Sequence, residues 1–138
     1  MRVHRKLRSE SGASAVEFAL LLPLLMLILF GIIEFGMALY RQAILTNASR
    51  EGARLGIVLS IPPITTAAIN TRIDTYLTAA GIPPGTVTPR TIVLGGATGT
   101  PVTVTLTLPY TFVSLPGFTS GSVIPTINLV ATTVMSHE

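Results

Sequence analysis

The chain has 138 residues, of which 49% are hydrophobic and 11% are charged, and its formal net charge is +3. This length allows one domain at most, and the composition excludes a charge-rich disordered chain. It also argues against an ordinary soluble domain, in which about 25% of residues are charged. Because the sequence contains no cysteine, disulfides, thiolate metal sites and cysteine nucleophiles are excluded.

The net charge is concentrated in a basic, polar leader over residues 1–12. The charged residues of this leader are Arg2, Arg5, Lys6, Arg8 and Glu10, so it carries the entire +3. From Ala13 onward, five basic and five acidic residues balance each other. A nucleic-acid partner requires a basic face with several phosphate contacts, so we expect no nucleic acid among the partners.

An apolar run without a charged residue follows, from Phe18 to Ile33, with Glu17 before it and Glu34 after it. As a helix, residues 18–35 would be about 27 Å long, close to the roughly 30 Å hydrocarbon thickness of a bilayer. We predict a membrane-spanning helix with its transmembrane part at residues 18–39. A buried core helix is the alternative, but the remaining chain is too small and polar to surround it. The basic leader predicts a single-pass topology with the N-terminus in the cytoplasm.

Helical character continues past the span, so the long helix is expected over residues 13–56. Arg50 and Arg54 are four residues apart and share one face, and Glu51 can pair with Arg54. This face is either a solvated surface or an interaction stripe for partner subunits.

Residues 57–138 are expected to form an extracytoplasmic α+β head. Apolar residues recur at three- and four-residue steps over residues 65–80, which predicts a short amphipathic helix that ends at Gly81. Alternation of apolar residues with threonine predicts strands, with a hairpin turn and a longer loop between them. These strands are 86–94, 102–108 and 126–135, with the turn at 95–99 and the loop at 114–125. The predicted fold class is α+β, with a long N-terminal membrane-spanning helix, a short second helix and a small antiparallel sheet of about three strands.

The start of the apolar run carries a motif, in which Gly12 and four residues from Ala13 precede Glu17 and Phe18. Glycine at a scissile bond allows the backbone to approach a protease closely. A glutamate at the edge of an apolar helix is costly and is usually functional, although snorkelling to lipid headgroups also accounts for it.

This combination resembles the start of type IV prepilin-like proteins. The resemblance implies that a prepilin peptidase cleaves between Gly12 and Ala13, which leaves Glu17 as the fifth residue of the mature chain. It also implies that Glu17, followed by Phe18, meets the new N-terminal amine of a neighbouring subunit and sets the register of assembly. A signal-peptidase site at residues 13–15 is the competing possibility, but it precedes the apolar run instead of following it.

Three blocks in order, at residues 15–23, 31–36 and 46–54, resemble the TadE-like family of minor pilin-like proteins (pseudopilins). This family belongs to the bacterial tight-adherence secretion system, which builds Flp pili. The resemblance implies a pilin-like fold, a place in the inner membrane and a role as a minor pilus subunit. The implied partners are the prepilin peptidase, other pilin and pseudopilin subunits, the inner-membrane pilus assembly machinery and membrane lipid.

Two other classes of function are alternatives to a pilus subunit. An uncleaved single-pass signal anchor with an extracytoplasmic binding or adhesion module requires no leader processing. An enzyme is disfavoured, because the carboxylates are scattered and His137 is the only histidine outside the leader. We expect no catalytic residues, no metal site and no cofactor.

Overall fold

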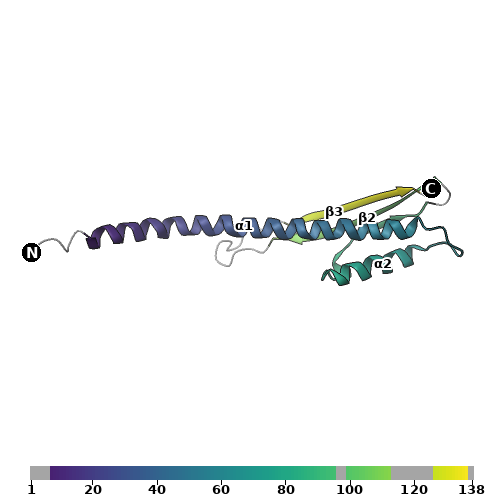
Figure 1. Ribbon diagram of the computed structural model, residues 1–138, viewed down its shortest axis with the longest axis horizontal. Coiled ribbons are helices and arrows are strands. Elements are labelled where there is room, and N and C mark those ends of the chain that lie inside the picture. Colours follow the sequence, from purple (N-terminus) through teal and green to yellow (C-terminus); the bar gives the residue numbers. More distant parts are fainter. Residues whose placement is uncertain (1–6, 96–98, 113–125, 137–138) are drawn as a thin grey trace, which may run out of the picture. The chain divides into compact units, whose positions relative to one another are not determined.

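The computed structural model describes residues 7–95, 99–112 and 126–136 (Figure 1). The predicted α+β class is confirmed: one long helix, α1 (Leu7–Gly56), precedes a second helix and a three-stranded antiparallel sheet. The chain divides into two units, residues 1–36 and residues 37–138, and α1 contributes to both.

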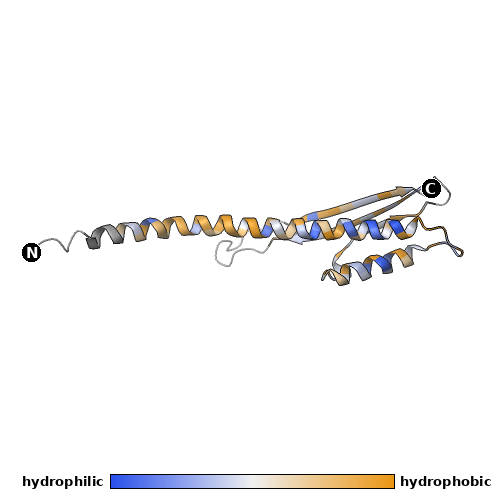
Figure 2. Cartoon of the chain, in the orientation of Figure 1, coloured by the Kyte–Doolittle hydropathy of each residue, from blue (hydrophilic) through white to orange (hydrophobic). Residues whose placement is uncertain are grey.

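The first unit contains the apolar part of α1, which is coloured as an almost continuous hydrophobic stretch in Figure 2. Its large side chains are exposed on every side of the helix, as the successive residues Leu20, Leu21 and Leu22 show. A helix that is apolar all round requires either a protein core or a membrane around it.

The second unit, from Met37 onward, is the head. After α1 come helix α2 (Thr66–Ala79), a single 3-10 turn η1 (Pro84–Thr86), and strands β1 (Arg90–Val93), β2 (Pro101–Thr111) and β3 (Thr126–Ser136). The strand order is β1-β2-β3, so β2 is the central strand and both pairings are antiparallel.

Helix α2 has well-formed ends that explain its boundaries. At its N-terminus, the Thr65 hydroxyl accepts a hydrogen bond from the backbone N–H of Ala68, at 3.2 Å. At its C-terminus, Gly81 has a φ of 77°, and the N–H groups of Gly81 and Ile82 donate to Thr78 and Leu77. This is a Schellman motif, so the expected glycine stop is confirmed.

The sheet follows the alternation in the sequence. Side chains of β2 that lie under the helices are buried, namely Val102, Val104, Leu106, Leu108 and Tyr110. The threonines between them lie on the opposite face, where the Thr105 and Thr132 hydroxyls of adjacent strands are 3.0 Å apart. On β3, Leu129 and Ala131 complete the buried face.

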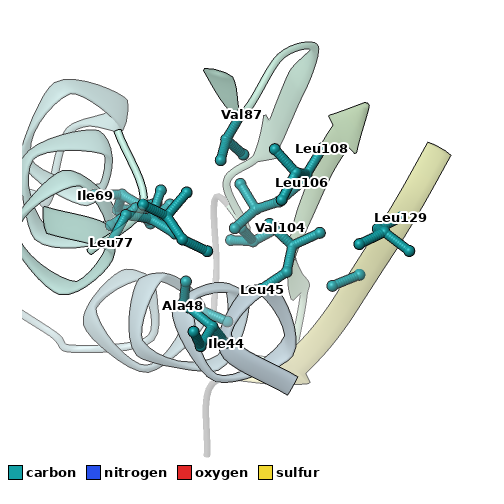
Figure 3. Packing of buried hydrophobic residues seen from close by; sticks show 14 of the residues in the cluster. Ile44, Leu45, Ala48, Ile69, Leu77, Val87, Val104, Leu106, Leu108 and Leu129 are labelled. Atoms are coloured by element: carbon teal, nitrogen blue, oxygen red, sulfur yellow. The ribbon is translucent and has the colours of Figure 1, made fainter. Parts of the chain in front are cut away.

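Figure 3 shows the core of the head, in which side chains from α1, α2 and the sheet point toward one another. Helix α1 contributes Ile44, Leu45 and Ala48, which are at most 7% exposed. Ser49 is fully buried, but its hydroxyl donates to the Thr46 carbonyl and lies 2.7 Å from the Thr133 hydroxyl of β3. This buried polar group is therefore satisfied.

Gly52 lets the two helices approach closely. A Cβ atom at this position would lie 2.8 Å from Cδ1 and 2.9 Å from Cγ1 of Ile73, and 3.3 Å from Cγ2 of Ile69. Both isoleucines are fully buried, so they have little room to move away.

Arg90 holds the connection between α2 and the sheet. Its guanidinium donates to the Asp74 carboxylate at 2.6 Å and to the carbonyls of Val87 and Pro84 at 2.8 and 2.5 Å. Its side chain is only 17% exposed. The sequence alone did not single out this residue.

Strand boundaries differ from expectation at β1, which is shorter than the predicted 86–94. Residues 84–86 form η1, and Pro89 has no N–H to donate to a ladder, so pairing begins at Arg90. The β1–β2 pairing agrees with a hairpin, but residues 96–98 of its expected turn lie outside the described residues. The expected loop at 114–125 also lies outside them.

Replacing Gly52 with leucine is expected to destabilise the head by about 1–3 kcal/mol, because the new side chain must push the helices apart. The measurement is thermal unfolding of the full chain in detergent. The matched control is Ala43→Leu, at an exposed position of the same helix. Equal melting temperatures for the two variants would contradict the close-packing account.

Replacing Arg90 with methionine is expected to cost about 1–3 kcal/mol, because two backbone carbonyls lose their donor. Arg72→Met is the control, since Arg72 pairs with Glu51 at 2.9 Å but is 56% exposed. An exposed pair of this kind contributes less than about 1 kcal/mol. Comparison of the two unfolding curves tests this ranking, and a larger loss in Arg72→Met would refute it.

Candidate functional site

The predicted processing and register residues all lie on α1 in the first unit. Gly12, Ala13, Glu17 and Phe18 are exposed helical positions, and Phe18 retains 60% of its accessible surface. Added atoms at Gly12 would meet nothing within 4 Å.

The backbone around the expected cleavage point is helical. Helix α1 begins at Leu7, before Ala13, so the Gly12–Ala13 bond lies inside the helix and not at its start. A protease that cuts here must open at least one helical turn, and Gly12 lowers the cost of doing so.

The apolar segment of α1 is suited to a bilayer. Within residues 7–95, 99–112 and 126–136, it is the one helix long and apolar enough to cross a membrane, and none of its most apolar 18-residue window is buried. The core-helix alternative requires that window to be covered by protein. The helix therefore indicates single-pass membrane anchoring.

The residues of the expected interaction stripe have different surroundings in the fold. Arg50 and Arg54 are exposed, whereas Glu51 is half-buried and pairs with Arg72 of α2. The suggested Glu51–Arg54 pair is therefore wrong, because the approach of α2 supplies a better-placed guanidinium. Glu51, Arg54 and Arg72 together border a cleft of about 300 Å³ between the two helices of the head.

A second cleft, of about 420 Å³, lies at the end of the head where α1 enters it. Met37, Tyr40 and Arg41 of α1 form one wall, and the opposite wall comes from residues 80–83, 86 and 108–109. The Arg41 guanidinium carbon lies 5.2 Å from the centre of the Tyr110 ring, a cation–π distance. The sequence alone does not reveal this cleft, because its lining comes from segments that are far apart along the chain.

A third cleft, of about 500 Å³, contains Asp74 and Arg90 in its lining, and these two side chains are paired with each other. In the described part of the chain, no three histidine, cysteine, aspartate or glutamate residues come together as a metal site would require.

Comparison with known proteins gives one match. The family model described as TadE-like protein matches residues 12–54, which include the apolar helix, Glu17 and the Arg50–Arg54 segment. No curated protein and no solved structure matches the chain. The expected resemblance to the TadE-like family is confirmed for residues 12–54.

Proposed function

We propose that this chain is a minor pilin-like (pseudopilin) subunit for assembly of a tight-adherence Flp pilus. The observation that carries the proposal is the order of features within the TadE-like segment. Gly12 and Glu17 lie on α1 immediately before its exposed apolar segment, and the same helix continues into the head. A soluble enzyme or a simple receptor has no need of this arrangement.

In this proposal the chain is inserted in the bacterial inner membrane, with the leader in the cytoplasm and the head on the other side. The basic residues before the span, and the balanced charges after it, support this orientation. A prepilin peptidase then cleaves after Gly12 and leaves a free amine on Ala13. Its partners afterwards are other pilin and pseudopilin subunits and the inner-membrane assembly machinery.

In this mechanism, Glu17 sets the axial register between neighbouring subunits. A carboxylate at the edge of an apolar helix is expensive in hydrocarbon. The new amine of Ala13 on a neighbouring subunit would offset that cost by pairing with it, but only at one axial displacement of the two helices. Phe18, which is largely exposed beside it, adds apolar area to the same contact.

Assembly then exchanges one apolar environment for another. The exposed leucines and isoleucines of α1 lie against lipid in the stored subunit and against other subunit helices in a pilus. Because apolar area stays out of water in both states, the hydrophobic term nearly cancels. The exposed Arg50 and Arg54 would form the part of the interaction stripe that the head leaves free.

A second candidate is an uncleaved signal anchor that presents an extracytoplasmic binding or adhesion module. One observation favours it: α1 runs through the Gly12–Ala13 bond without interruption. In that case the leader stays attached, and its helical part is the start of the membrane anchor.

The intact mass and N-terminal residue of the membrane-extracted protein distinguish the two. Loss of residues 1–12 is expected only in cells that contain the prepilin peptidase. Gly12→Leu should abolish the loss, because glycine is what allows the backbone at the cut to open and approach the protease. Gly31→Leu, at an open position of the same helix, is the control. A leader retained in wild-type cells with the peptidase would support the anchored module.

Replacing Glu17 with alanine is expected to leave membrane insertion intact and to reduce pilus assembly strongly, because the register contact is lost. Pili are counted by electron microscopy, and membrane fractions are probed for the subunit. Glu51→Gln, which removes a carboxylate charge in the head, is the control. Normal piliation in the Glu17→Ala strain would rule out the register role.

A further inference from the structure

The cleft beside Arg41 is lined by residues that directly follow the predicted membrane span along α1. The core of the head begins at Ala38, which is 6% exposed, directly after the exposed Phe35 and Met37. Arg41 follows residue 39, the last residue of the predicted span, by two residues, which is about 3 Å along a helix. The headgroup region beyond the hydrocarbon is about 5–8 Å thick on each side. The cleft is therefore at the level of lipid phosphates.

The walls of this cleft are amphipathic. Apolar lining comes from Met37, Ile82, Pro83, Leu108 and Pro109, and Tyr40 is 59% exposed beside them. Among the described residues of the lining, Arg41 is the one that carries a charge. An amphipathic ligand with an anionic end therefore fits the cleft better than a purely polar ion does.

Arg41 is available for an anion. Among the described residues, no carboxylate lies within ion-pair distance of its guanidinium, and its contact there is with the face of the Tyr110 ring. A cation–π contact orients the group but leaves N–H donors at its edge unused. Those donors suit the paired oxygens of a phosphate.

We infer that this cleft binds the headgroup of an anionic phospholipid from the leaflet on the head's side of the membrane. The phosphate meets Arg41, the glycerol region lies against Tyr40, and the upper acyl carbons contact Met37. The lining residues that the structure describes include no carboxylate that could accept the ammonium group of a zwitterionic lipid. The cleft therefore prefers phosphatidylglycerol to phosphatidylcholine. This inference depends on membrane anchoring and not on a role in a pilus.

The test is native mass spectrometry of the full chain in detergent micelles doped with phosphatidylglycerol or phosphatidylcholine of identical acyl chains. Wild-type protein is expected to retain phosphatidylglycerol preferentially. Arg41→Gln should lower that retention roughly tenfold, since it removes a charge-assisted pair. Arg50→Gln, on the exposed side of the same helix in the head, is the matched control and should behave as the wild type.

Three results would overturn the inference. One is equal retention of both lipids by the wild type, and another is equal retention of phosphatidylglycerol by Arg41→Gln and wild type. The third is displacement of the lipid by millimolar inorganic phosphate, which would assign the site to free anions. Thermal unfolding of Arg41→Gln is measured in parallel, and Arg41→Lys should restore part of the retention if charge is what binds. Because lipid retention is measured on purified protein, its failure leaves the assembly proposal intact.

Discussion

Helix α1 has to be stable in two environments, and the rest of the structure depends on how its apolar side chains are distributed. Up to Phe35 they surround the helix on all sides and are exposed. From Ala38 onward they form one stripe, with Leu45, Ala48 and Ala53 fully buried and Arg50 and Arg54 on the outside. The change from all-round to one-sided hydrophobicity marks where the helix stops facing lipid and begins to face protein.

The head is small, so it needs close packing along that stripe. Gly52 permits contact with Ile69 and Ile73 of α2, and the opposite side of the core is the buried face of β2. Direct hydrogen bonds add to this packing. Gln42 donates to the Val130 carbonyl of β3 at 2.8 Å, and Ser49 lies against Thr133 of the same strand. These bonds tie α1 to the edge strand and fix its position over the sheet.

Much of this architecture could be predicted from the sequence because its determinants are local. The alternation of apolar residues and threonine placed β2, and the spacing of Ile69, Ile73 and Leu77 placed α2 and its buried face. The pairing of charges could not be predicted in the same way. Glu51 has a possible partner four residues or fewer away, but it pairs with Arg72, 21 residues distant, because tertiary packing decides which guanidinium arrives.

The candidate sites also differ in whether local sequence or tertiary packing determines them. Gly12 and Glu17 form a linear motif and are visible in the sequence before any fold is known. The cleft at Arg41 has walls from α1, the α2–η1 connection and β2, so its existence depends on how three separate segments meet. Sequence hydropathy places Arg41 just after the predicted span, but it could not predict which distant residues complete the cleft.

In the proposed function, the two kinds of site would impose opposite demands on a subunit that leaves the membrane. Pairing of Glu17 with a neighbouring amine favours extraction, because it removes the cost of an isolated carboxylate in the apolar segment. A phosphate bound at Arg41 favours retention, because the charge-assisted contact and the associated lipid are lost when the head moves away from the bilayer. The carboxylate precedes the apolar segment and the arginine follows it, so the two interactions act at opposite ends of the same span. In the proposed function, the lipid contact at Arg41 would keep the subunit in the membrane until pairing at Glu17 contributes more free energy than that lipid contact.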